Sequence, residues 1–332
     1  MHHSERILQT RSVEVVTEGA PFCEWLLRRG HRVVRTASGY WYDAAWKVYQ
    51  AFPYHKLICP NESEVKTLLT SERAIALRYS SSFTGPERKL RYHVIQVAPV
   101  PPQTAVPRKI RQELARGFRR ARIERISLEL LSEQGWEHRQ EALTRQGRNR
   151  AENQQWWRRL CTSAIGLPGF EAWGAFDERG ALVGSLLAYA GEECYTLLEQ
   201  QTLTRALHTG VNGVLFYTAI KNGLETTGLP LAFLAHQSLD APDSVDNFKF
   251  GMGYSARPVR QRVVFHPALQ LFCKPALLPL LRKLRQFYPS SPVLAKGEGL
   301  LRFAIEGQKP LNSQELPSCL GDLKGQLMEQ IQ

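Results

Sequence analysis

The sequence has few cysteines, and they lie far apart. None of the six forms a Cys-x-x-Cys pair, and none is accompanied by histidines at zinc-finger spacing. This distribution argues against a disulfide framework and against a structural zinc site. We therefore expect no metal at the functional site, and a reducing cytoplasm as the compartment.

Long apolar runs are also missing. The first six residues contain no apolar signal-peptide core, so no signal peptide is expected. The longest apolar run, 268–281, is broken by Lys274, Pro275 and Pro279, and is shorter than the roughly 20 residues that span a bilayer. A soluble, cytoplasmic protein is expected. The segment 267–284 can lie as a helix on the inner face of an anionic membrane, but packing on the rest of the protein is the preferred interpretation.

Positive charge, by contrast, is abundant. Lysine and arginine number 43 against 31 acidic residues, which gives a formal net charge of +12. With 43% hydrophobic and 22% charged residues, the 332-residue chain has a globular composition and a length that suits two domains of about 150 residues. The charge favours anionic partners in general, including nucleic acid, anionic lipid and phosphorylated substrates.

The densest positive charge is predicted to lie on a helix over 107–121. Eight basic residues stand between 108 and 125 against two acidic ones. Ile110, Leu114 and Phe118 recur every four residues, so one stripe should face a core while the arginines face an anion or simply water. The aromatic group 40–42, with Trp46 behind it, is interpreted as core, with a stacking platform for a base as the alternative.

The segment 195–236 has the most informative pattern. It predicts a strand (195–201), a glycine loop (205–213), a helix (211–227) and a second strand (229–236), preceded by a hairpin over 170–190. Such a loop turns backbone N–H groups and the positive helix end toward one point, where a phosphate can bind. The alternative is that the glycines only end a loop.

Elsewhere the patterns predict strands over 126–131, 260–266 and 300–305, and a helical region over 132–164 that breaks at Gly147. Strands, one crossover helix and further strands indicate an α/β protein of the α+β type, with mostly antiparallel sheets flanked by helices.

These elements, followed by Phe248-Lys249, a glycine and an aromatic residue, resemble the FemAB-type acyltransferases of the GNAT fold. The resemblance implies two tandem GNAT-like halves, 1–131 and 132–266, and a C-terminal extension, 267–332. It also implies acyl transfer to an amine or hydroxyl, often on a cell-envelope or polysaccharide precursor. The donor is acetyl-CoA or another acyl-CoA, or aminoacyl-tRNA; the usual GNAT phosphate-loop spacing is absent, so both donors stay open.

Three residues are candidates for catalysis. Glu199 can act as a general base, His236 at a strand end can transfer protons, and Lys249 matches the lysine of the family's Phe-Lys pair, where it would stabilise an oxyanion. Their alternatives are a solvent-facing strand residue, a structural histidine and a surface lysine. The remaining site predictions are donor binding by Arg205, Gly210, Val211, Asn212, Gly213 and Phe248, and acceptor binding by Arg145 and Tyr42.

The expected acceptor is an anionic or phosphorylated small molecule, a glycan or a peptide, and tRNA is a possible partner. Two other functions compete with acyl transfer. One is RNA binding through the basic helix and the aromatic group, and the other is an inactive GNAT-like scaffold that docks on a membrane through 268–285.

Overall fold

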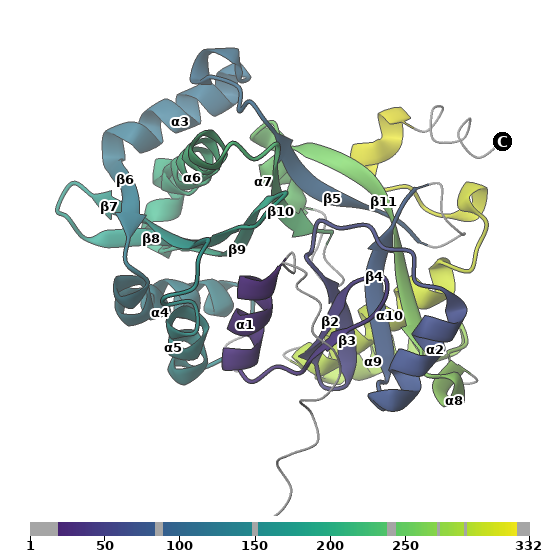
Figure 1. Cartoon of the computed structure of the whole chain (residues 1–332). Helices are drawn as coiled ribbons and strands as arrows, with labels where there is room; N and C mark the ends of the chain where they lie inside the picture. Colours follow the sequence, from purple (N-terminus) through teal and green to yellow (C-terminus); the bar gives the residue numbers. More distant parts are fainter. Residues whose placement is uncertain are drawn as a thin grey trace, which may run out of the picture.

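The computed structural model describes residues 19–83, 89–147, 152–237, 244–270, 273–288 and 291–323. Within them, eleven strands form one mixed sheet, most of whose neighbouring strands are antiparallel, with helices on its faces (Figure 1). This confirms the expected fold class. None of the described helices has the length and apolar content needed to cross a bilayer.

The N-terminal part of the chain builds one end of the sheet. Its elements are α1 (Ala20–Arg28), β1 (Val33–Arg35), β2 (Tyr40–Ala45), β3 (Val48–Phe52), α2 (Glu62–Ser71), β4 (Ala76–Ser81), β5 (Lys89–Val97), the short 3-10 helix η1 (Gln103–Ala105) and α3 (Arg108–Arg120).

The central part builds the other end. Its elements are β6 (Ala121–Ile126), α4 (Leu128–Arg145), α5 (Gln154–Thr162), β7 (Phe170–Asp177), β8 (Leu182–Ala190), β9 (Tyr195–Thr202), η2 (Thr204–Thr209), α6 (Val211–Thr227), β10 (Leu231–His236), α7 (Ser244–Gly251) and β11 (Ser255–Phe265). The C-terminal elements are α8 (Pro267–Gln270), α9 (Leu277–Phe287), α10 (Pro292–Glu306), η3 (Leu311–Ser313) and η4 (Ser318–Leu323).

The two ends of the sheet exchange strands where they meet. The strand order is β1-β2-β3-β4-β11-β5-β10-β9-β8-β7-β6, so β11 lies between β4 and β5, and β5 lies between β11 and β10. Both neighbours of β11 therefore come from the first 131 residues, and both neighbours of β5 come from beyond them. The sheet is continuous across the predicted boundary at residue 131, and the division into halves stays a prediction.

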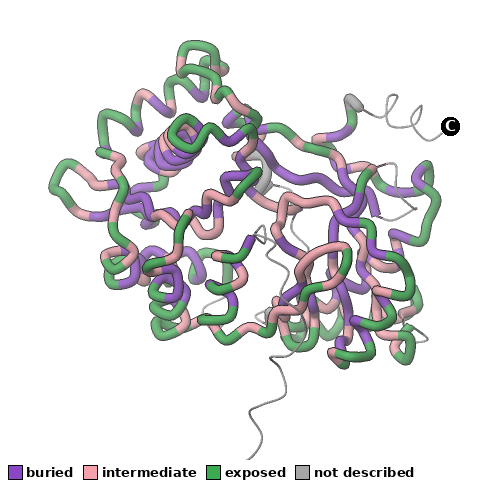
Figure 2. The backbone as a smooth tube through the Cα atoms, viewed as in Figure 1, coloured by how far each residue is buried: buried purple, intermediate pink, exposed green. Residues whose placement is uncertain are grey.

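Helix α6 fills the largest core. Val214, Leu215, Ala219 and Ile220 are fully buried, and they pack with apolar residues of β5, β8 and β9 (Figure 2). Gly210 before the helix and Gly228 after it both adopt left-handed backbone angles, with φ of 84° and 70°, which favour glycine and delimit the helix. The predicted helix over 211–227 is confirmed, and so is the hairpin before it.

Two predicted strands are wrong. Residues 128–131 form the first turn of α4, because the Ser127 hydroxyl accepts a hydrogen bond from the Leu130 N–H and caps a helix there. Residues 300–305 lie inside α10, whose start is capped by Ser291. In both cases a serine cap starts a helix, Ser127 inside the predicted strand and Ser291 nine residues before the other one, and the local apolar run does not reveal it.

The preferred interpretation of the aromatic group 40–42, as part of the hydrophobic core, is confirmed. Trp41 is fully buried and Tyr42 is 8% exposed, and both lie on β2 among other aromatic rings. Trp46 is 79% exposed. A stacking platform made of the whole group is therefore ruled out.

Candidate active site

Strands β9 and β10 run side by side only at their beginnings. They are parallel, and their register contains two pairs, Ala232 with Tyr195 and Phe233 with Thr196. Beyond these pairs β9 follows β8 and β10 follows β5 to its last residue, His236. The C-terminal ends of the two strands are therefore splayed apart. In sheets with parallel strands, ligands bind at such ends.

A bulge on β9 lies at the start of this divergence. Leu187 of β8 faces Glu199, while the next residue, Ala188, faces Leu197, so Leu198 is the extra residue. A bulge bends its strand and re-aims the following side chains. Glu199 comes directly after the extra residue and lies beyond the last β9–β10 pair.

Glu199 belongs to an ion-paired triad. Its Oε2 atom accepts hydrogen bonds from Arg139 of α4, at 3.0 Å, and from the Gln201 side-chain amide, at 3.2 Å. Arg139 also donates to Glu152, with Nε to Oε2 at 2.7 Å. Burial raises the pKa of Glu199, the Arg139 charge opposes that shift, and the Glu152 charge adds to it. The result is a fixed, poorly solvated carboxylate with an elevated proton affinity.

On the β10 side, His236 packs against a second histidine. The His236 ring centre lies 4.8 Å from that of His93 on β5 and 5.0 Å from that of Phe233. Both ring nitrogens of His236 are buried, and they have no hydrogen-bond partner among the described residues. Burial, followed by the charges of His93 and Arg78, lowers the pKa of His236 well below its usual value. The imidazole is therefore neutral at physiological pH.

Tyr54 connects the two sides. It follows β3, and its ring centre lies 5.8 Å from that of His236. Its hydroxyl is hydrogen-bonded to that of Tyr42, at 2.8 Å. Burial raises the pKa of Tyr54 well above its usual value, with Tyr42 and the Glu199 carboxylate adding to the shift. Groups from β9, β10 and the N-terminal part of the chain thus converge at the splayed ends.

The glycine loop is packed rather than open. Gly117 of α3 and Gly210 meet so closely that a Cβ atom on Gly210 would lie 2.5 Å from the Glu113 carbonyl oxygen, and one on Gly117 would lie 2.6 Å from the Gly210 carbonyl oxygen. Gly213 faces Met252 and the Glu113 carboxylate. Asn212 accepts hydrogen bonds from Gln200 and Thr202 at the end of β9. The glycines at 117 and 210 therefore permit α3 to cross the start of α6.

Comparison with solved structures identifies proteins of similar fold. No protein-family model and no curated protein sequence matches this chain. The crystal structure of FemX matches 77% of this chain and 94% of its own, with 10% identity and a TM-score of 0.52. The fold is FemAB/GNAT-like. A conserved protein of unknown function from Bacteroides thetaiotaomicron VPI-5482 is similar, with 10% identity, a TM-score of 0.50 and coverage of 73% of this chain and 87% of that one. A tandem GNAT protein from the clavulanic acid biosynthesis pathway matches 70% of this chain and 82% of its own at 12% identity, with a TM-score of 0.43.

In this FemAB/GNAT-like fold, two predicted site arginines hold the loop after β9. Arg145 donates to the Thr204 hydroxyl at 2.7 Å and to the Thr202 carbonyl oxygen at 3.0 Å. Arg205 donates to Asp177 in the β7–β8 turn, at 3.4 Å, and its side chain is 59% exposed. Acceptor binding by Arg145 and donor binding by Arg205 stay predictions.

The Phe-Lys pair lies on α7. The Phe248 ring centre lies 6.1 Å from that of Phe216 on α6, and the Phe250 ring centre lies 5.5 Å from that of Tyr92 on β5. Lys249 stands between these two anchored rings and is half-buried. The structure thus brings the segment 248–252 to the first turn of α6, through Met252 and Gly213. The catalytic role of Lys249 stays a prediction.

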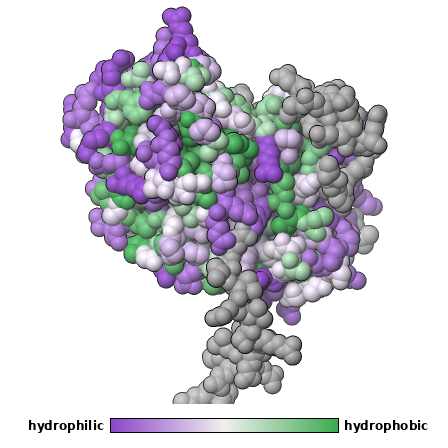
Figure 3. Space-filling model, turned by 45° about the horizontal axis from the view of Figure 1, so that its top comes forward, coloured by the Kyte–Doolittle hydropathy of each residue, from purple (hydrophilic) through white to green (hydrophobic). Residues whose placement is uncertain are grey.

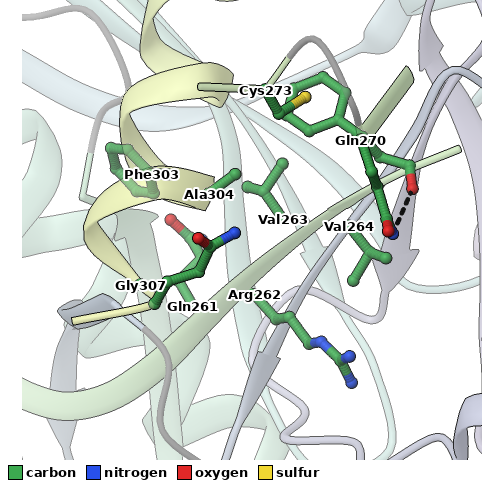
Figure 4. A pocket seen from close by; sticks show the side chains of 11 residues that line it. Gln261, Arg262, Val263, Val264, Gln270, Cys273, Phe303, Ala304 and Gly307 are labelled. Atoms are coloured by element: carbon green, nitrogen blue, oxygen red, sulfur yellow. Dashed lines mark hydrogen bonds between the residues drawn. The ribbon is translucent and has the colours of Figure 1, made fainter. Parts of the chain in front are cut away.

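A small cavity adjoins the group at the splayed ends, because Tyr54 and Thr196 are among the residues that line it, and two larger cavities lie elsewhere. One of about 410 Å³ lies between β11 and α10, where Val263, Phe303 and Ala304 meet Gln270 and Cys273 (Figure 4). A shallow hollow of about 580 Å³ lies at the end of α3 and contains Arg119, Arg120 and Arg122. Hydrophilic side chains dominate the edge of the molecule where α3 lies (Figure 3). No group of three or more histidine, cysteine or acidic side chains among the described residues is arranged to hold a metal ion.

Sequence analysis missed four residues of the convergent group: Tyr54, His93, Arg139 and Glu152. A signal for His93 exists, because a histidine in the apolar run of a central strand is expected to be buried and to need a partner. Its Nε2 atom lies 2.9 Å from the Ser80 hydroxyl. The pairing of Arg139 with Glu199, 60 positions apart, leaves no local signal.

Proposed function

We propose that this protein is an acyltransferase, and that the reaction takes place at the splayed ends of β9 and β10. It moves an acetyl, other acyl or aminoacyl group from acyl-CoA or aminoacyl-tRNA to an amine or hydroxyl. One observation supports the proposal most. Tyr54 contacts His236 and is affected by the charge of Glu199, so the three residues lie near one another at these ends within a FemAB/GNAT-like fold.

Glu199 is proposed as the general base. Both of its hydrogen bonds within the described chain are accepted by Oε2. Burial raises its pKa, which strengthens it as a base. The acceptor nitrogen or oxygen attacks the donor carbonyl carbon and gives up its proton to Glu199. The bond to the donor sulfur or ribose oxygen then breaks, and the leaving group takes up the proton that Glu199 received, which restores the carboxylate.

His236 is proposed to stabilise the oxyanion. A neutral imidazole carries one N–H, and an N–H directed at the carbonyl oxygen stabilises the charge that develops there. The lowered pKa of His236 supports this role, because the ring is then neutral at physiological pH and keeps a single N–H group that can donate a hydrogen bond. Lys249 is proposed to add positive charge beside the donor.

The donor is proposed to approach from the loop 205–213, with Gly210, Val211, Asn212 and Gly213 lining its path and Phe248 and Arg205 at its sides. Tyr42 and Arg145 are proposed on the acceptor side. An anionic small molecule, a glycan or a peptide of the cell envelope suits the positive charge of the chain as acceptor.

Acyl release in the presence of hydroxylamine tests the proposal without knowledge of the acceptor. Purified protein is mixed with labelled acetyl-CoA, a long-chain acyl-CoA or aminoacyl-tRNA, and hydroxamate is measured as the amount formed above a reaction without protein, because hydroxylamine also attacks these donors unaided. We expect hydroxamate from one donor, and a rate at least 100-fold lower for Glu199→Gln. Glu178→Gln, an exposed carboxylate in the β7–β8 turn, is the matched control and should retain the rate. Absence of hydroxamate from all three donors, together with absence of a thermal shift, would count against an acyltransferase.

RNA binding is a second candidate, favoured by α3. Its outer face is exposed and basic, and Arg108, Lys109 and Arg119 are exposed members of it. We expect a gel shift with RNA at low salt that weakens steeply as salt is added. Replacing these three residues with glutamine should abolish the shift. If wild-type protein shifts no RNA at low salt, this candidate is removed.

A further inference from the structure

Helix α9 has one broad apolar face, and only part of it is covered. Leu277, Leu278 and Leu281 on one edge of this face are half-buried. Leu280, Leu284 and Phe287 on the other edge are 53%, 37% and 68% exposed, and their i, i+4, i+7 spacing places them in one stripe. A helix that only packs on a protein buries its apolar face. The exposed stripe therefore needs its own explanation.

Ion pairs fix the orientation of this helix. Glu298 of α10 is 7% exposed in its side chain, and its oxygens lie 3.7 Å from Nε of Arg282 and 3.3 Å from Nη1 of Arg285. Arg302 approaches the same carboxylate at 3.8 Å. Because α9 is held against α10 by these contacts, the stripe of Leu280, Leu284 and Phe287 stays on the outside.

Two further exposed apolar side chains stand close to the helix in the sequence. Tyr288 directly follows α9 and is 62% exposed, and Val293 near the start of α10 is 79% exposed. Together with the α9 stripe they form five of the ten large apolar side chains that are exposed in the described chain. We call these five residues the α9 patch. Large exposed apolar patches mark interaction surfaces.

The charge around the α9 patch is of one sign. Between residues 267 and 300 the sequence has five basic residues and one acidic residue, Glu298. That acid is buried and paired, while Lys274, Lys283 and Lys296 are exposed. Exposed leucine and aromatic side chains bordered by lysines are the composition of helices that lie in the interface of anionic membranes.

We infer that the α9 patch docks this protein on an anionic membrane surface, with α9 parallel to the bilayer. The five apolar side chains enter the boundary between headgroups and acyl chains, and the three lysines contact lipid phosphates. This inference does not depend on the proposed acyl transfer, and its test measures no catalysis.

Vesicle co-sedimentation with the full chain tests the inference. We expect binding to vesicles of equimolar phosphatidylcholine and phosphatidylglycerol, and weak binding to phosphatidylcholine alone. Leu280→Glu with Phe287→Glu should reduce the partition coefficient more than tenfold. Trp46→Glu, at an equally exposed aromatic residue outside the patch, should leave it unchanged. All variants should keep the wild-type melting temperature, because the replaced side chains are exposed.

A second set of variants tests whether binding to anionic vesicles depends on the lysines near the α9 patch or only on the net charge of the protein. Each lysine near an anionic surface contributes about fivefold to partitioning, so Lys283→Gln with Lys296→Gln should reduce binding roughly 25-fold. Lys47→Gln with Lys66→Gln changes the net charge equally and should have little effect. The inference is overturned if wild-type protein ignores anionic vesicles, or if both lysine pairs reduce binding alike. It is also overturned if the patch variants abolish self-association of a protein that binds no vesicles, because a second copy then covers the patch.

Discussion

Gly210 offers a sharp test of how the start of α6 is built. The residue has a φ of 84°, and a Cβ atom there would lie 2.5 Å from the backbone oxygen of Glu113. Alanine at this position has to adopt a left-handed conformation, at a cost of about 1 kcal/mol. It also has to push α3 away, and overpacking of this kind costs about 1–3 kcal/mol. We expect Gly210→Ala to lower the free energy of unfolding by about 3 kcal/mol.

Gly228 is the matched control, because it shares the backbone conformation without the crowding. Its φ is 70°, and no atom lies within 4 Å of the Cβ position. Gly228→Ala should therefore cost only about 1 kcal/mol. With an unfolding entropy of about 2.1 cal/mol/K per residue, the melting temperature should fall by about 4 °C for Gly210→Ala and by 1 to 2 °C for Gly228→Ala.

Differential scanning fluorimetry and urea unfolding measure both variants. Equal losses at the two positions would refute the close crossing of α3 over α6. Both losses would then come from the left-handed backbone conformation alone.

Three further predictions concern the buried charges and the strand exchange. Burial lowers the folded-state pKa of His93, to about 3, and of His236. The unfolded chain therefore binds more protons below about pH 6.5, so stability should fall as pH falls through this range. His93 alone should contribute up to about 1.4 kcal/mol per pH unit as pH falls toward about 4, and His236 should add to this slope. Replacing both with glutamine should flatten a plot of unfolding free energy against pH. Arg139→Gln removes a positive charge that opposes the raised pKa of Glu199, so the acidic limb of the pH–rate profile should move to higher pH. Halves divided at residue 131 should each be unfolded by circular dichroism, because β5 and β11 then lose both neighbours.

Each of these predictions has an outcome that contradicts it. An unchanged pH slope in the double histidine variant would mean that the two rings are solvated. Glu152→Gln should move the acidic limb in the direction opposite to Arg139→Gln, because the Glu152 charge raises the pKa of Glu199; shifts of the same sign would argue against Glu199 as the titrating base. A cooperatively melting fragment 132–332 would show that the strand exchange is dispensable.

The local elements of the second half could be predicted from the sequence, because their signals are local. The helix over 211–227 is delimited by two glycines in left-handed conformation, and the 170–190 hairpin by its turn residues. The strand expected over 126–131 failed for the opposite reason. Ser127 lies within a strand-like run, and only its hydroxyl bond to the Leu130 N–H reveals that a helix starts there.

The arrangement of the site could not be predicted in the same way. The exchange of β5 and β11 joins residues from both ends of the chain, and no periodicity within a segment encodes it. Glu199 could be named as a candidate base from the sequence, because it stands near the end of a strand before a glycine loop. Its partner Arg139 was missed because an arginine on an exposed-looking helix is usually solvated. The glycines of the loop suggest phosphate binding, whereas the contact between Gly117 and Gly210 gives a packing reason for one of them.

The most direct test of the account is a single-turnover measurement with the donor that yields hydroxamate, comparing wild type with Glu199→Gln. The account predicts that donor affinity and melting temperature stay close to wild type while the rate of acyl transfer falls at least 100-fold, because the base that receives the acceptor proton is gone. An unchanged rate at saturating donor would contradict acyl transfer at the splayed ends of β9 and β10.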